Sequence, residues 1–175
     1  LEQAIASFRS VDTLKAQISD LPEADKLSVA DSQAVAAAEK MFVALTTEQK
    51  DCLTIAEVEK AAAVFAEMKR ILEAPIKDAE AKIDAIGEVT LESENAIDAA
   101  RAAYEALTEA QQAEVKSYDK LTAAEARLAD LKAAKAVDEK IDAIGEVTLA
   151  SEEAITATRA AYEALTEAQQ AQVTN

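Results

Sequence analysis

The feature that most constrains this chain is an internal repeat. Residues 83–117 align with residues 141–175 without a gap, at a spacing of 58 residues (141 − 83). Seven of the 35 aligned positions differ, which leaves 28 identical. A chain that repeats at a fixed spacing folds into similar units that each pack on their neighbours. We therefore expect a tandem array of small units.

A more divergent copy lies upstream of these two. Residues 34–49 align with residues 96–111, and the apolar positions of the two segments coincide. Spacings of three and four residues between such positions are typical of one face of an amphipathic helix. The coincident pairs are Val35 with Ile97, Phe42 with Tyr104, and Leu45 with Leu107.

The same point in each unit carries a residue that ends helices. Gly87 and Gly145 follow the last apolar position of a predicted helix, and Pro22 stands there in the first unit. Glycine adopts the left-handed conformation at little cost, and proline lacks the N–H donor. The apolar positions upstream also match, with Leu14, Ile18 and Leu21 aligned to Val137, Ile141 and Ile144.

A second proline, Pro75, is expected to end or kink the helix that precedes the second unit. We therefore divide the chain into units at residues 1–74, 76–133 and 134–175. The third unit is predicted to be truncated before its last helix, because the counterpart of residues 118–131 would follow Asn175. We expect the sequence to be part of a longer chain.

One uninterrupted helix is predicted from Thr122 to Ile144. Thr122 followed by Glu125 is the pattern of a capping box, and Gly145 follows the last apolar residue. At 100° per residue the apolar stripe turns by roughly 150° midway along this helix, which indicates that two bundles share it. We predict an all-α, elongated tandem array of three-helix bundles whose second and third units are joined by this helix.

Other helix starts carry similar signals. Thr–x–x–Gln and Thr–x–x–Glu capping boxes are predicted at Thr46, Thr54, Thr108 and Thr166. Ser93 and Ser151 are predicted N-caps of the middle helices. The segment before Ser93 is expected to be extended, with Val89 and Leu91 turned inward.

Composition narrows the functional classes. Half of the residues are hydrophobic, but aromatic residues make up only 3%, so the cores should be thin and rich in alanine. The formal net charge is −16, which argues against nucleic acid as a partner because phosphate binding needs clustered Lys and Arg. No apolar run is long enough to predict membrane insertion.

Side chains suited to catalysis are scarce. The chain has no His, one Cys, and two Gly that both stand at helix ends. This inventory excludes histidine-based triads, phosphate-binding glycine loops and histidine metal sites, and no segment has the pattern of a calcium loop. We therefore expect no enzyme activity, no catalytic residues, no cofactor and no metal. Cys52 is interpreted as small apolar filler beside Leu53, the alternative being a reactive thiol.

Two arginines occupy one repeat position, Arg101 and Arg159. Together with Glu105 and Glu163 one turn later, they are candidate partner-binding residues, since Arg is frequent in interface hot spots. The alternative is that they form surface ion pairs with Glu105 and Glu163 one turn later. Tyr104, Tyr162 and Phe42 share a stripe position and are predicted to pack in the core, whereas the sequence leaves Tyr118 open.

The repeat IDAIGEVTLESENAIDAARAAYEALTEAQQAEVKSYDKLTAAEARLADL resembles the tandem three-helix, FIVAR-like modules of extracellular and cell-wall proteins of Gram-positive bacteria, Firmicutes especially. The resemblance covers residues 76–175 well and residues 1–74 only by pattern. It implies a secreted setting, extracellular and associated with the cell surface or cell wall, and it implies no catalytic residues.

The sequence leaves three functions open. The leading prediction is a noncatalytic stalk or spacer of a large bacterial surface or secreted protein, whose partners are the neighbouring domains of the same polypeptide. The alternatives are a protein-binding module that recognises a host extracellular protein through an exposed helix face, and an accessory module of a secreted multidomain hydrolase.

Overall fold

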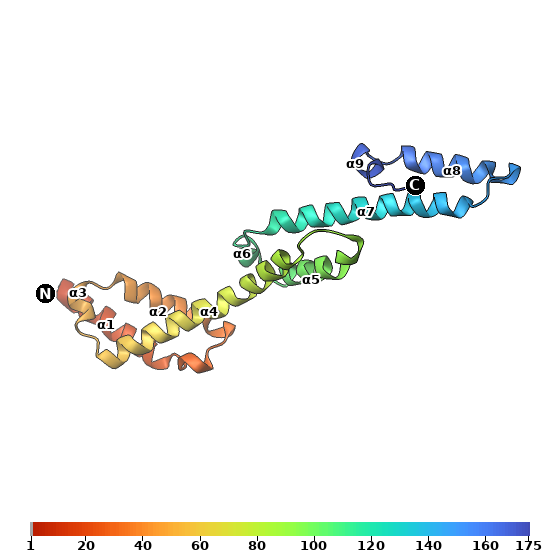
Figure 1. The fold of residues 1–175 in the computed structure, drawn as a ribbon. Helices are drawn as coiled ribbons and strands as arrows, with labels where there is room; N and C mark the ends of the chain where they lie inside the picture. The colour runs from red at the N-terminus through yellow and green to blue at the C-terminus, as the bar shows by residue number, and fades with distance from the viewer. Residues whose placement is uncertain (1) are drawn as a thin grey trace. The chain divides into compact units, whose positions relative to one another are not determined.

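The computed structural model describes residues 2–175, with side chains from Phe8 onward. Over this range the chain is all-helical, as predicted (Figure 1). It divides into two compact units, Leu1–Pro75 and Ile76–Asn175. The α-helices are α1 Glu2–Asp20, α2 Ser32–Ala44, α3 Thr47–Lys50, α4 Ile55–Ala85, α5 Glu94–Glu105, α6 Glu109–Gln112, α7 Tyr118–Ile144, α8 Glu152–Glu163 and α9 Glu167–Gln170. Short 3-10 turns are η1 Ala24–Lys26, η2 Val29–Asp31, η3 Leu91–Ser93 and η4 Leu149–Ser151.

The first unit is built around one apolar cluster to which α1, α2 and the beginning of α4 contribute. Leu14 and Ile18 of α1 are fully buried, and Val35 of α2 and Val64 of α4 lie in the same cluster. These residues recur at helical spacing, so each helix turns one apolar stripe to the common core.

The second unit has a corresponding cluster formed by the end of α4, by α5 and by the first half of α7. Its most buried members are Ile83, Ile97, Ala100 and Leu121. In Figure 1, α5 runs along the first half of α7 and α8 runs along the second half. The buried residues of α7 accordingly extend from Leu121 to Val137.

Glycine ends two of the long helices, as predicted. Gly87 and Gly145 have φ angles of 64° and 59°, in the region that L side chains rarely adopt. The α4 helix ends at Ala85, and α7 ends at Ile144 with Gly145 as its C-cap. In the first unit α1 ends at Asp20, before Pro22. Glycine and proline therefore end helices at matching positions in the units.

The predicted capping boxes hold for the short helices. Thr46, Thr108 and Thr166 each accept a hydrogen bond from the N–H of the Gln three residues later, whose side chain returns to the Thr N–H. Thr54 and Glu57 form the same reciprocal pair at the start of α4. Both donors that would otherwise lack a partner at each helix start are satisfied.

The predicted start of α7 is wrong. The helix begins at Tyr118, and the Thr122 hydroxyl donates to the carbonyl of Asp119 at 2.9 Å. Thr122 is the fifth residue of this helix, so its N–H is not among the first four that lack an intrahelical partner, and the Glu125 carboxylate is bonded to Arg101 instead. Thr122 therefore lies inside the helix, where a hydroxyl that bonds a preceding carbonyl is ordinary.

Pro75 was predicted to end or kink the helix, and the predicted end is wrong, because α4 continues from Ile55 to Ala85 with Pro75 inside it. Proline fixes φ near the helical value and removes a single N–H donor, so a long helix can contain one. Leu91 departs from prediction as well: it begins η3, capped by the Thr90 side chain, and is 37% exposed. Ser93 does stand at the N-cap of α5, but its hydroxyl accepts from the Thr90 N–H.

Candidate functional site

Arg101 projects from α5 toward α7 and binds Glu125 with both arms of its guanidinium. Its Nε lies 2.6 Å from Oε1 and its Nη2 lies 2.5 Å from Oε2. The two side chains are 25% and 32% exposed. These hydrogen bonds to Glu125 raise the pKa of Arg101, against the opposing effect of desolvation. The pairing of Arg101 with Glu105 expected from the sequence is therefore wrong, because a bidentate partner on another helix takes its place.

Two tyrosines complete this arrangement, which we call the Arg101 cluster: Arg101, Tyr104, Tyr118 and Glu125. The rings of Tyr104 and Tyr118 stack with centroids 4.5 Å apart at 27°. The guanidinium carbon of Arg101 lies 5.7 Å from the first ring centroid and 5.5 Å from the second. Both rings pack against the apolar cluster of the second unit. Tyr118, whose place the sequence left open, thus joins α7 to α5.

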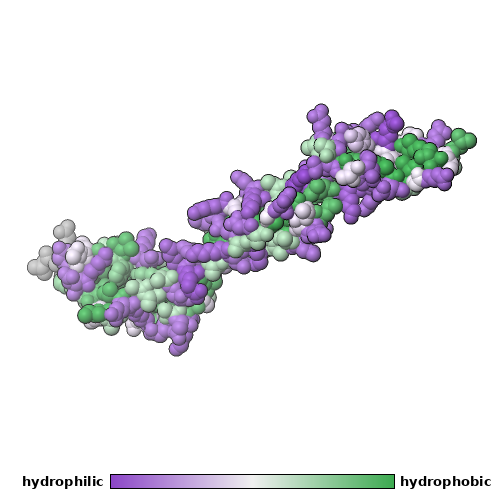
Figure 2. Space-filling view, in the orientation of Figure 1, coloured by the Kyte–Doolittle hydropathy of each residue, from purple (hydrophilic) through white to green (hydrophobic). Residues whose placement is uncertain are grey.

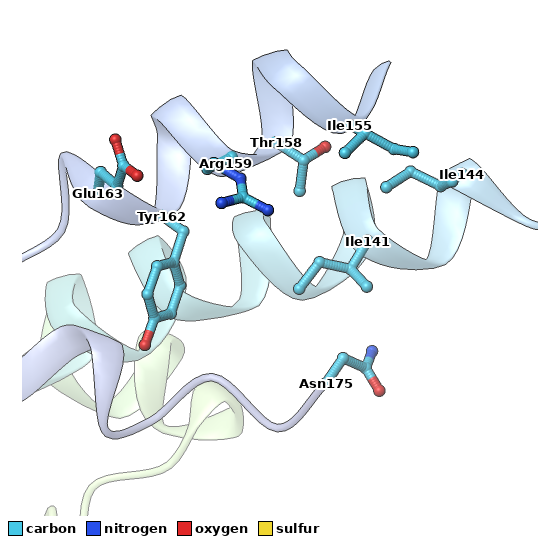
Figure 3. A pocket seen from close by; sticks show the side chains of 8 residues that line it. All are labelled: Ile141, Ile144, Ile155, Thr158, Arg159, Tyr162, Glu163 and Asn175. Atoms are coloured by element: carbon cyan, nitrogen blue, oxygen red, sulfur yellow. The ribbon is translucent and has the colours of Figure 1, made fainter. Parts of the chain in front are cut away.

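The equivalent arginine in the third repeat is in a different situation. Arg159 is exposed, and within the described part of the chain it makes no hydrogen bond or ion pair, including with Glu163. Both line a groove of about 460 Å³ between α7 and α8 (Figure 3). The remaining lining residues are Ile141, Ile144, Ile155, Thr158, Tyr162 and Asn175.

The third repeat buries its apolar stripe less completely than the second. Ile83 and Ile97 are 0% and 2% exposed, whereas their counterparts Ile141 and Ile155 are only half-buried. Tyr162 is 38% exposed, so the core position predicted for it is wrong. Val147 and Leu149 are also exposed, and Figure 2 shows hydrophobic surface where α7 ends and α8 begins. Among the residues that the structure describes, no helix lies over this surface as the first half of α7 lies over the second repeat.

The segment after the last short helix is fixed in the same way in both repeats. The N–H of Lys116 donates to Glu80 at 2.9 Å, and the N–H of Thr174, its counterpart, donates to Asp138 at 3.0 Å. Asn175 adds a further bond to Asp138. Desolvation opposes the ionisation of Asp138, but the hydrogen bonds from Thr174 and Asn175 outweigh it and lower the pKa of this carboxyl.

The contacts of Glu125, Glu80 and Asp138 were not predicted from the sequence. Glu125 is 24 residues from Arg101, so no local spacing indicated the pair. Glu80 and Asp138 were detectable, because both are acidic and stand 58 residues apart at one repeat position (138 − 80).

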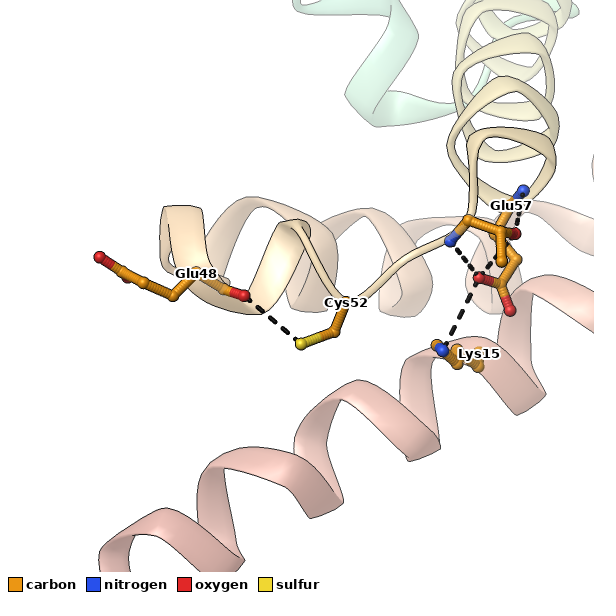
Figure 4. Close-up of polar contacts among 5 residues, drawn as sticks. Lys15, Glu48, Cys52 and Glu57 are labelled. Carbon is orange, nitrogen blue, oxygen red and sulfur yellow. Dashed lines mark hydrogen bonds and ion pairs between the residues drawn. The ribbon is translucent and has the colours of Figure 1, made fainter.

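Cys52 in the first unit is exposed and does not fill the core, so its predicted packing role is wrong. Its Sγ donates to the carbonyl of Glu48 at 3.4 Å, in the turn that follows α3 (Figure 4). Leu53 takes the buried position instead. Nearby, the Glu57 carboxylate accepts hydrogen bonds from Thr54, and these lower the pKa of Glu57. Its Oε2 lies 3.9 Å from the Nζ of Lys15.

Among the residues that the structure describes, no three His, Cys, Asp or Glu side chains are grouped so as to hold a metal ion. None of the helices in this range combines the length and the apolar character that crossing a membrane requires. Comparison with protein-family models, with curated proteins and with solved structures finds no match to this chain.

Proposed function

We propose that this chain is a noncatalytic spacer made of tandem three-helix bundles, with α7 as the helix shared by its second and third units. The observation that carries the proposal is that equivalent residues 58 positions apart make equivalent contacts: Lys116 with Glu80 and Thr174 with Asp138. The repeat therefore includes the hydrogen bond that holds the segment after the last short helix. We expect a contact repeated in this way to fix the orientation of each unit relative to the next, which is what a spacer requires.

The side chains of α7 support this interpretation. Leu121 and Leu128 are buried in its first half, and Ala134 and Val137 are buried in its second. A helix of 27 residues is about 40 Å long, so neighbouring units that share it would follow one another along its axis. Sharing a helix also couples units that would be marginal alone, since a domain of about 60 residues buries only about 60% of its unfolded surface.

Small-angle scattering from chains with increasing numbers of the 58-residue unit would test the spacer function. The maximum dimension should rise linearly, by at most about the 40 Å length of the shared helix for each unit. The matched control is a set in which the added units are joined by flexible Gly/Ser linkers, whose dimension grows more slowly with length. A radius that grows as for a compact globule would contradict the spacer function.

A protein-binding module is the second candidate, and Arg159 is the observation that favours it. Its guanidinium is exposed without a partner in the described part of the chain, whereas Arg101 is engaged by Glu125. A host protein captured by the chain and lost with Arg159→Ala, while Arg101→Ala retains it, would support this function. Equal loss with both variants would argue against it.

The extracellular, cell-surface or cell-wall setting in a Gram-positive bacterium, and the alternative of an accessory module in a secreted hydrolase, rest on the resemblance of residues 76–175 to FIVAR-like modules. The sequence of the full reading frame tests both, through a secretion signal, a wall-anchoring tail and a catalytic domain.

A further inference from the structure

The groove between α7 and α8 can be compared position by position with a filled one in the same molecule. Its residues Ile141, Ile155 and Arg159 are the repeat equivalents of Ile83, Ile97 and Arg101 (each 58 residues apart). In the second repeat the equivalent surface is covered by the first half of α7, whose Leu121, Ala124 and Leu128 are buried there. The chain itself therefore shows what kind of element fits this surface.

The first half of α7 makes three kinds of contact with the surface that it covers: apolar packing, ring stacking and ion pairing. Its leucines and alanine fill the apolar part of the surface, Tyr118 stacks on Tyr104, and Glu125 binds Arg101. Further along, Lys132 pairs with Glu94 at 2.5 Å, and the repeat equivalent of Glu94 is Glu152 at the start of α8. The open groove presents the same set: apolar side chains, an exposed ring at Tyr162, a guanidinium at Arg159 that has no partner among the described residues, and an acidic helix start.

We propose that the groove formed by Ile141, Ile144, Ile155, Arg159 and Tyr162 binds a helix from a further copy of the same repeat. The occupant carries an aromatic residue, Leu, Ala, Glu and Leu at the spacing of Tyr118, Leu121, Ala124, Glu125 and Leu128. The bonds from Thr174 and Asn175 to Asp138 hold the preceding segment as Lys116 is held by Glu80. This inference rests on the tandem arrangement in the proposed function.

The test compares the chain with a version in which residues 118–133 are repeated directly after Asn175. Hydrogen exchange of α8 is measured in both. The added helix should slow exchange of the α8 amides by about tenfold or more, because packing removes local opening, and should bring them toward the rates of α5. A control extension in which the counterparts of Leu121 and Leu128 are changed to Ser should leave the α8 rates unchanged.

Arg159 supplies a second, independent readout. In the extended chain Arg159→Gln should speed exchange of α8 several-fold, whereas in the original chain it should have no effect. If the extension does not slow α8, or the Ser control slows it equally, the proposal is wrong. If sedimentation shows that the original chain self-associates and that this alone protects α8, the occupant belongs to a second molecule of the protein and not to an added repeat, and the proposal is overturned. Scattering reports the spacer function separately, since an array can lengthen whether or not this last groove is filled.

Discussion

Arg101→Gln and Arg159→Gln change the same residue at one repeat position in two different surroundings. Arg101 makes two charge-assisted hydrogen bonds to Glu125 and lies over two tyrosine rings, whereas Arg159 has no partner in the part of the chain that the structure describes. The structure therefore predicts unequal costs for one chemical substitution.

The magnitude follows from these contacts. Hydrogen bonds to a charged group contribute about 1.5–3 kcal/mol, and the lower end applies because both side chains are a quarter to a third exposed. The rings add about 0.5 kcal/mol at such partly exposed positions. We expect Arg101→Gln to cost about 2 kcal/mol in total. Arg159→Gln should stay within about 0.5 kcal/mol, as is usual for surface substitutions.

Native-state hydrogen exchange resolves the two helices within the intact chain. A cost of about 2 kcal/mol corresponds to roughly 30-fold faster exchange in α5, at about 1.36 kcal/mol for each factor of ten. The α8 rates should barely change with Arg159→Gln. Arg101→Lys is the matched control, because it keeps the charge but loses the bidentate geometry, and should give an intermediate effect. Equal effects of the two Gln variants would refute the reasoning.

Three further predictions follow. Pro75→Ala adds an N–H donor to a helix interior and should stabilise the chain by about 1–3 kcal/mol. Ala133→Pro, at the equivalent repeat position, removes such a donor and should destabilise the chain by about 3 kcal/mol. Thermal unfolding temperatures that shift in the same direction for both variants would contradict this. The pKa of Asp138 is lowered in the folded state, so its contribution to stability is present above the unfolded pKa of about 3.9 and is lost as pH falls through the folded pKa. The NMR signal of the Thr174 amide should show that its hydrogen bond to Asp138 is lost in acid. Asp138→Asn should remove this pH dependence. Cys52 is exposed, so a thiol reagent should modify it in the folded protein at nearly the rate seen in urea, and slow labelling would show that it is buried.

Local signals predicted most of the helix ends correctly. Each of these helix ends depends only on residues within one turn of it, as at the capping boxes of Thr46 and Thr108 and at the C-cap Gly145. All of the interacting residues are therefore close together in the sequence, and a local pattern is enough to predict them. The start of α7 was missed because Glu125, which formed a local pattern with Thr122, is bonded to a residue on another helix. Tertiary contacts of this kind have no fixed spacing in the sequence.

The candidate site was predicted less well for the same reason. Arg101 and Arg159 are identical in local sequence signal, with Glu four residues later in both cases. What separates them is the presence or absence of a packed helix above each arginine. The position of Tyr162 depends on the same helix, so a stripe residue that is buried in one repeat is exposed in the next.

The unbroken course of α7 from Tyr118 to Ile144 has a practical consequence for anyone who divides this chain. Its buried residues extend from Leu121 to Val137, so every cut near Ala133, where one sequence period gives way to the next, severs a packed helix. Fragments designed on the sequence period should expose apolar side chains and aggregate. A fragment that ends in the turn at Gly145 keeps α7 whole but loses α8, which packs along its second half, so Ala134 and Val137 should become exposed as well.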